Sequence, residues 1–174
     1  MSLQIAIWVV AAVLVFWTVG AYNRLVSLRN AIVRSFAPVD QQFGLRHALL
    51  QQQIEAAGAV LSHAADRLET LRAACLQAEA ARAHAKAHPG APGAIKSLRL
   101  ADDILGEARA RIPMQSVSGV DMTELNGQLG AADSALQFAR REFNTAVLDY
   151  NRAVRQIPTR LIAAIFGFSP AGTL

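Results

Sequence analysis

Apolar residues fill the first segment of the chain, where no charged side chain occurs between Leu3 and Ala21. As a helix rising about 1.5 Å per residue, this run spans about 28 Å, close to the hydrocarbon thickness of a bilayer. Backbone hydrogen bonds must be satisfied internally in lipid, so the run predicts a transmembrane helix. The alternative is a signal peptide cleaved at the small residues 19–21, but residues 1–4 lack the Lys or Arg with which signal peptides begin.

Beyond this run, apolar residues recur at steps of three and four, the spacing of one helix face. Four such stripes occur: Leu25, Leu28, Ile32, Phe36, Val39 and Phe43; Ile54, Ala57, Leu61, Ala64, Leu68, Leu71, Cys75 and Ala78; Leu98, Ala101, Leu105, Ala108 and Ile112; and Leu125, Leu129, Ala132, Leu136, Ala139, Phe143, Ala146, Tyr150, Ala153 and Ile157. The last three stripes have the alternation of a left-handed supercoiled seam. Loops at 88–93 and 112–119 separate the later stripes. Between the first two, Gly44 and a change of phase over 46–52 are the only signs of a break.

Short connections make consecutive helices antiparallel, so the pattern predicts an all-α fold. We expect an N-terminal transmembrane helix that continues into an antiparallel up-down-up-down four-helix bundle. The anchor would be residues 1–21, the bundle 22–158, and an apolar membrane-proximal tail 159–174. The composition agrees, because alanine, the best helix former, is abundant and aromatic residues are only 6%. The alternative is a longer three-helix coiled coil in which the third stripe is only a loop helix.

The tail is apolar over residues 161–168 but too short to span a bilayer, which needs about 17–25 residues. We expect it to lie in the membrane interface beside the anchor, with Arg160 towards the headgroups. The candidate interfacial residues are Leu161, Ile162, Ile165, Phe166 and Phe168. The alternative is that the tail caps the core of the bundle.

Basic residues are concentrated in the two segments that such a bundle would bring to its membrane-proximal end. Residues 22–39 and the residues after Asp149 contain no acid, and their arginines are Arg24, Arg29, Arg34, Arg152, Arg155 and Arg160. Each suitably placed basic residue is worth about 1 kcal/mol of attraction to an anionic leaflet. Because no basic residue precedes the span, the positive-inside rule places the N-terminus outside and the C-terminal domain in the cytoplasm. A chance clustering of exposed arginines is the alternative.

Two pairs of asparagines share a spacing of seven residues, Asn23 with Asn30 and Asn144 with Asn151. Asparagine is a poor helix former, so its repeated presence in periodic helices calls for a reason. Residue numbers that face each other in antiparallel helices have a constant total, and one total, 174, serves both Asn23 with Asn151 and Asn30 with Asn144. We therefore predict that these amides hydrogen-bond across the seam and fix its register. The alternative is that all four are solvated flank residues.

Motifs for catalysis or cofactor binding do not occur in the sequence, which has no glycine-rich phosphate loop, nucleophile elbow or zinc-protease motif. His84 and His88 could share a helix face, but no carboxylate or cysteine lies in the same turns, and we interpret them as solvated. Cys75 falls on an apolar stripe and should be a buried small hydrophobe. We therefore expect no enzyme, no catalytic residue, no cofactor and no bound metal.

Charged residues elsewhere suggest solvated faces. Asp102, Asp103 and Glu107 form a small acidic cluster that we expect to face water. Nucleic-acid binding is not expected, because the arginines lie at the two ends of the domain instead of forming a basic face interleaved with aromatics.

Both ends of the bundle sequence contain a set of recognisable motifs. Residues 21–30, directly after the apolar run, resemble the opening of the LemA family, and 39–42 resembles its Ile-Asp-x-Gln step. The closing signature is matched in order and spacing by residues 139–144, 150–151, 157–163 and 166–168. The middle departs, since residues 46–53 stand where the family tends to have a basic pair followed by Leu-Ile-Pro-Asn. The resemblance implies a bacterial single-pass membrane protein with an antiparallel helical bundle and no agreed catalytic activity.

These observations together predict a membrane-anchored scaffold or interaction protein of the LemA type in the bacterial inner membrane. Its expected partners are the anionic leaflet, copies of itself and an unidentified protein. Small residues in the span (Ala11, Ala12, Gly20 and Ala21) permit close helix approach and favour self-association. The alternative is a membrane-bound sensor or regulatory subunit that binds and controls a partner enzyme.

Overall fold

The computed structural model describes residues 2–58, 65–112 and 123–174, and these ranges contain helices and turns but no strand. The helices are α1 (Ser2–Gly58), α2 (Ala65–Ala87), α3 (Pro92–Ala110), α4 (Thr123–Arg155) and α5 (Thr159–Ile165). The predicted all-α class is confirmed. The predicted loop at 112–119 lies, apart from its first residue, outside the described residues, as do Leu61 and Ala64 of the second stripe.

The first helix is one uninterrupted element, and the break expected near Gly44 or within 46–52 is wrong. Ile54 and Ala57, assigned above to the second helix, belong to α1. The change of phase has a different cause. Up to Phe43 the buried face of α1 contributes to one core cluster, and from Leu49 onward it contributes to another.

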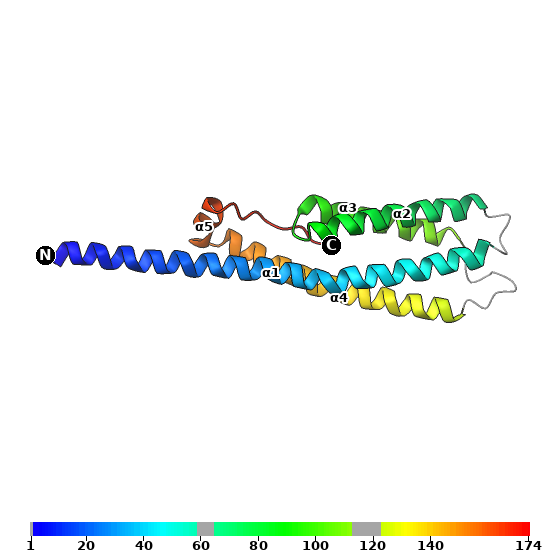
Figure 1. The fold of residues 1–174 in the computed structure, drawn as a ribbon, viewed down its shortest axis with the longest axis horizontal. Helices are drawn as coiled ribbons and strands as arrows, with labels where there is room; N and C mark the ends of the chain where they lie inside the picture. Colours follow the sequence, from blue (N-terminus) through cyan, green and yellow to red (C-terminus); the bar gives the residue numbers. More distant parts are fainter. Residues whose placement is uncertain (1, 59–64, 113–122) are drawn as a thin grey trace.

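The four long helices form two layers, with α1 beside α4 and α2 beside α3 (Figure 1). In Figure 1, α1 and α3 run in one direction and α2 and α4 in the other. The three-helix alternative is wrong, because α3 has 19 residues and packs extensively along α2. The N-terminal part of α1 projects beyond the bundle.

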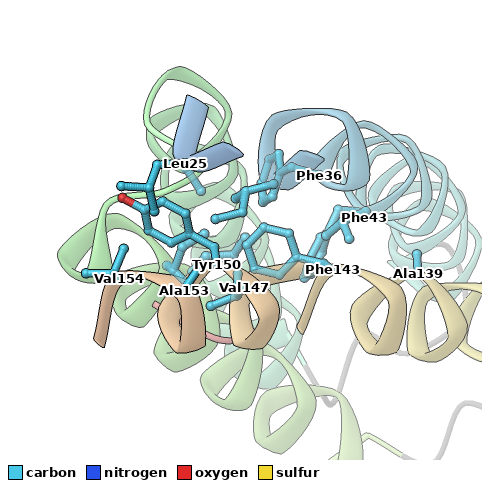
Figure 2. Close-up of a cluster of buried hydrophobic side chains, with 14 of the residues drawn as sticks. Leu25, Phe36, Phe43, Ala139, Phe143, Val147, Tyr150, Ala153 and Val154 are labelled. Atoms are coloured by element: carbon cyan, nitrogen blue, oxygen red, sulfur yellow. The ribbon is translucent and has the colours of Figure 1, made fainter. Parts of the chain in front are cut away.

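Two hydrophobic clusters make up the core. The distal cluster joins the end of α1 to α2, α3 and the start of α4, and includes Cys75. The proximal cluster, drawn in Figure 2, joins the middle of α1 to the end of α2, the first half of α3, α4 and α5, with the Phe36 and Phe143 rings 5.6 Å apart, edge to face. The third stripe is buried throughout. The fourth is buried or half-buried except for Ile157, which lies beyond the end of α4 and is 78% exposed.

The projecting part of α1 has the length and composition to cross a membrane. Its most apolar 18-residue window has a mean hydropathy of 2.2, and none of that window is buried within the protein. Trp8 and Phe16 are more than 70% exposed, which is costly in water and natural in lipid. Apolar side chains become buried only from Leu25 onward, so one helix carries both the bare apolar surface and part of the bundle core.

Candidate functional site: the membrane-proximal end and the tail

The last helix, α5, lies beside α1 at the end of the bundle from which the apolar helix projects (Figure 1). Its short sequence has two faces. Ile162 and Ala163 are buried in the proximal cluster, whereas Leu161, Ile165 and Phe166 are 65%, 74% and 52% exposed. The predicted interfacial residues of α5 and its end therefore fall into an exposed group and a buried group. Ile162 does not face outward but caps the core, and the alternative reading of the tail holds for this face alone.

Aromatic contacts connect the end of α5 and the residues after it to α1. The ring of Tyr22 lies 4.9 Å from that of Phe166 and 5.7 Å from that of Phe168, between centroids. Phe168 is half-buried against the proximal cluster, so it too departs from the predicted interfacial set. Tyr22 directly follows the predicted anchor, and these contacts therefore fix the exposed face of α5 close to the level at which the predicted span would end.

The arginines singled out from the sequence are all exposed: Arg24, Arg29, Arg34, Arg152, Arg155 and Arg160. Arg152 forms an ion pair with Asp149 at 3.3 Å, and the other five have no ion pair within the described ranges. Arg155 ends α4 and Arg160 is in the first turn of α5, so both lie at the end where the apolar helix leaves the bundle. Arg34 lies further along α1, at the edge of a groove.

That groove runs between α1 and α4 and encloses about 780 Å³. Its apolar lining includes Leu28, Pro38 and Phe138, and Phe138 is 62% exposed although it is a large hydrophobe. Arg34, Glu142 and other polar side chains add charge of both signs to the lining. The groove therefore combines exposed apolar surface with charge of both signs.

The asparagines on α4 bind the end of the chain, and the predicted Asn–Asn pairs are wrong. Asn144 and Asn151 both hydrogen-bond main-chain atoms of residues 171–174, and Asn23 and Asn30 are exposed.

The true register of α1 and α4 explains the failure. Facing residue numbers total 179 for Phe36 with Phe143, for Arg46 with Asp133 and for Gln53 with Asn126. This is five residues from the predicted total of 174, which exceeds one helical turn. The side-chain amides of Asn144 and Asn151 therefore do not face Asn23 and Asn30, and they bind main-chain atoms of the tail instead.

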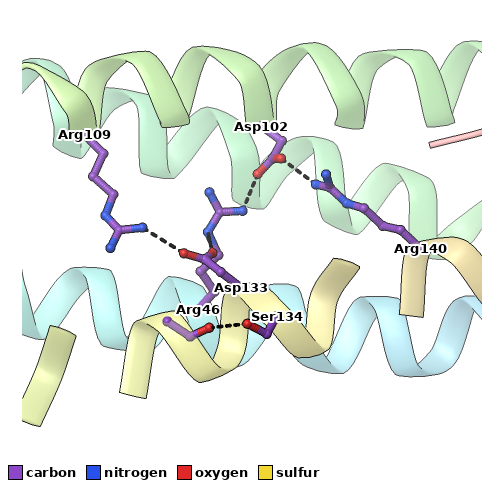
Figure 3. Close-up of polar contacts among 7 residues, drawn as sticks. Arg46, Asp102, Arg109, Asp133, Ser134 and Arg140 are labelled. Carbon is purple, nitrogen blue, oxygen red and sulfur yellow. Dashed lines mark hydrogen bonds and ion pairs between the residues drawn. The ribbon is translucent and has the colours of Figure 1, made fainter. Parts of the chain in front are cut away.

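A buried ionic network between the two layers was not predicted from the sequence (Figure 3). Asp102, on α3, accepts hydrogen bonds at 2.5 Å from Arg46 of α1 and from Arg140 of α4. Asp133, on α4, pairs at 3.0 Å with Nε of Arg46 and with Arg109 of α3. The expectation that Asp102 faces water is wrong, since it is 8% exposed; its neighbours Asp103 and Glu107 are exposed as expected. The network joins α3 to α1 and α4.

A second ionic cluster joins α1 to α2. Arg82 donates to Asp40 at 2.7 Å and to Glu79 at 2.5 Å, and Lys86 pairs with Asp40 at 2.8 Å. The hydrogen bond from Arg82 lowers the pKa of Glu79, and the same bond raises the pKa of Arg82. The carboxylate of Glu79 is therefore held in its ionised, hydrogen-bonded form.

Cys75, His84 and His88, the candidate reactive residues considered in the sequence, all lie in the part of the chain that the structure describes. The thiol of Cys75 is fully buried, and burial raises its pKa, which keeps it protonated and unreactive. The rings of His84 and His88 lie 5.1 Å apart, but no group of three potential metal ligands occurs among the residues that the structure describes.

Comparison with known families agrees with this architecture. The model of the LemA family matches residues 35–174, which include α2 to α5 and most of the bundle part of α1. The chain belongs to the LemA family. Among curated proteins, none matches it. The matched region of this LemA-family chain contains both ionic clusters, the tail and the α4 side of the groove, whereas Leu28 and Arg34 of the groove precede it.

Proposed function

We propose that this LemA-family protein is a non-enzymatic scaffold, anchored by α1 in the bacterial inner membrane with its bundle in the cytoplasm. The observation that carries the proposal is the continuity of α1. A helix with no break between its apolar projection and the buried core at Leu25 transmits position and tilt directly, so the bundle stands at a fixed height above the bilayer. A flexible linker would not impose this.

Contact with the leaflet follows from the proximal end of the bundle. Leu161, Ile165 and Phe166 are exposed there, and fully burying one such side chain is worth about 1.5–3 kcal/mol. Arg155 and Arg160 flank these residues and would meet anionic headgroups. In this arrangement α5 would lie in the interface like an amphipathic helix: one face packs on the protein core and the other meets lipid.

The cytoplasmic orientation rests on charge. Three arginines (Arg24, Arg29 and Arg34) follow the span closely, whereas residues 1–4 contain no basic side chain, and this bias sets orientation in single-pass proteins. A cytoplasmic bundle also suits the free, buried Cys75, which needs no oxidising compartment.

The scaffold role rests on the groove between α1 and α4. We propose that a second copy docks there, with exposed Phe138 as the central apolar contact. A lining that carries both signs of charge suits self-association, because the same surface can present complementary partners. The alternative role, a regulatory subunit that controls an enzyme, would use the same groove for a different protein.

Photo-crosslinking in cells tests the scaffold proposal. A photoreactive residue in place of Phe138 should crosslink the protein to a second copy, and detergent extraction should recover that homo-oligomer. The same residue in place of Leu100, which is 57% exposed on α3 and remote from the groove, is the matched control. Capture of a stoichiometric enzyme at Phe138, with no self-crosslink, would replace the scaffold role with the regulatory one.

Lipid contact by α5 has its own test. An environment-sensitive fluorophore at Phe166, in protein reconstituted in nanodiscs, should report an apolar surrounding. The same fluorophore at exposed Thr173 should report water. Equal aqueous signals at the two positions would refute the interfacial placement.

A further inference from the structure

The tail segment, residues 168–174, runs without helical structure along α4 and is bonded to it by side chains. Asn151 accepts a hydrogen bond from the amide of Ala171 at 2.7 Å and donates to its carbonyl at 2.9 Å. Asn144 does the same for Leu174, at 2.9 and 2.8 Å. Each asparagine therefore satisfies both main-chain groups of one tail residue. We refer to Asn144 and Asn151 as the asparagine ladder.

The spacing of the ladder matches an extended peptide. Two positions seven residues apart on a helix lie about 10.5 Å apart along its axis and nearly on one face. Three residues of polyproline II chain span about 9.3 Å, and after three residues this conformation presents its main chain to the same side again. Ala171 and Leu174 are three residues apart. The ladder thus hydrogen-bonds every third residue of an extended chain that runs antiparallel to α4.

Side-chain requirements add selectivity to this main-chain recognition. A Cβ on Gly172 would lie 2.8 Å from Cα of Pro92 at the start of α3, so the residue directly after Ala171 must be glycine. The hydroxyl of Tyr150 donates to the carbonyl of Ser169 at 3.0 Å. Ala171 and Leu174 are half-buried against the proximal cluster. The ligand class is an extended peptide with a small residue, a glycine and, two positions later, an apolar residue.

We propose that the asparagine ladder is a peptide-binding site that is filled in cis by the protein's own tail segment and also accepts the tail segment of a second copy. The tail segment meets every requirement of the site, and each copy carries it. Its attachment permits exchange. Ile162 and Ala163 are themselves buried in the core, so α5 has an attachment besides the tail segment, and the chain turns at Gly167, whose φ of +71° favours glycine.

Membrane anchoring makes exchange geometrically feasible, and in this respect the inference rests on the proposed function. Copies in one bilayer hold their ladders and tails at the same height, which raises the effective concentration of each tail near its neighbour's ladder. Residues 171–174 bind the ladder, so the four residues after Gly167, up to Ala171, bridge the gap, and extended they reach at most about 13–14 Å, roughly one helix diameter. That length reaches a bundle in direct side-by-side contact, and exchanged tails would join such copies of the scaffold.

Crosslinking between two full-length populations in shared proteoliposomes tests this proposal. The donor carries Thr173→Cys together with Asn144→Ala and Asn151→Ala, so that its own ladder cannot hold its tail. Alanine is a good helix former, and circular dichroism should show that the donor keeps its helicity. The acceptor keeps its ladder and carries Leu148→Cys. Leu148 is 56% exposed and lies between Asn144 and Asn151 in the sequence of α4.

A short bis-maleimide should link donor to acceptor, with a yield at least fivefold above that for an acceptor whose ladder is also replaced by alanine. An acceptor with Asn23→Ala and Asn30→Ala, the exposed pair of equal spacing, is the matched control and should retain the full yield. A yield that does not depend on the acceptor's ladder, or no product above background, would overturn the proposal. Failure of the anchoring itself is recognised separately, because the protein would then not float with the liposomes.

Discussion

Replacing Asp102 by asparagine should destabilise the bundle far more than the same change at the next residue. The substituted amide would keep the shape of the side chain and lose the charge that faces Arg46 and Arg140. The side chains of Asp102 and Arg46 are only 10% and 8% exposed, so water cannot take over the role of the carboxylate. Removing one partner of a buried ion pair costs about 3–5 kcal/mol, because the other charge remains buried and uncompensated.

Two features of the network place the cost of Asp102→Asn at the lower end of that range. Arg46 keeps its ion pair with Asp133 at 3.0 Å, and the Arg140 side chain is 26% exposed and partly hydrated. We expect a loss of about 3 kcal/mol, which for a chain of this size lowers the melting temperature by about 6–12 °C. Thermal unfolding followed by circular dichroism in detergent measures it.

The matched control is Asp103→Asn, on the same helix turn but exposed, which should change stability by less than about 0.5 kcal/mol. Equal melting temperatures for the two variants would refute the reasoning, because they would mean that the buried carboxylate contributes no more than a solvated one.

Three further predictions concern the core and the tail. Phe143→Ala should cost about 3–5 kcal/mol of unfolding free energy in denaturant titrations, because Phe143 is fully buried, whereas Phe138→Ala on the same helix should cost less than about 0.5; similar losses would contradict the packing described. Gly172→Ala should release the tail segment, seen as faster hydrogen exchange of its amides by mass spectrometry, and unchanged exchange would mean that the close approach to α3 is not limiting. Burial raises the pKa of the Tyr150 hydroxyl above its ordinary value of about 10, so its hydrogen bond to the tail should persist below pH 10 and be lost as the pH rises through the folded pKa. The fluorescence anisotropy of a fluorophore on the tail should then fall in the wild-type protein. A fall of the same size and midpoint in Tyr150→Phe would rule out this cause.

Hydrophobic periodicity predicted the helices because it reports a local quantity, the side of a helix that is removed from water. The third and fourth stripes are buried almost to their ends for this reason. The continuity of α1 could not be inferred in the same way. A change of phase near residue 46 has the same appearance whether the helix ends there or turns its buried face to a new cluster.

Assuming a break in α1 also concealed the ionic network. On a continuous helix, Arg46 falls three residues after Phe43 and four before Leu50, both buried, which places a charged side chain on the seam. Asp102, four residues after Leu98 and three before Leu105, occupies the equivalent place on α3. Helix phase distinguishes it from Asp103. A charge on a seam predicts a buried partner, and this signal was present in the sequence.

The register could not be obtained from the asparagines, for a geometric reason. Any two pairs with equal spacing on antiparallel helices share one total, so the agreement between the pairs contained no information beyond the spacing. The actual register is set by large contacts such as Phe36 with Phe143 and by the ion pair of Arg46 with Asp133. Main-chain recognition of the tail segment leaves little trace in a sequence, because the atoms recognised are common to all residues.

The side of the membrane on which the bundle stands is the point on which the proposed function depends most. Labelling of intact cells with a membrane-impermeant thiol reagent measures it in two variants with one added cysteine each, Ser2→Cys and Gly90→Cys. A side chain at Gly90 meets no atom within 4 Å, so the second variant should fold normally, and Cys75 is buried and should give no background. We expect Ser2→Cys to be labelled in intact cells and Gly90→Cys only after permeabilisation. Labelling of Gly90→Cys in intact cells would place the bundle outside the cytoplasm and contradict the proposed function.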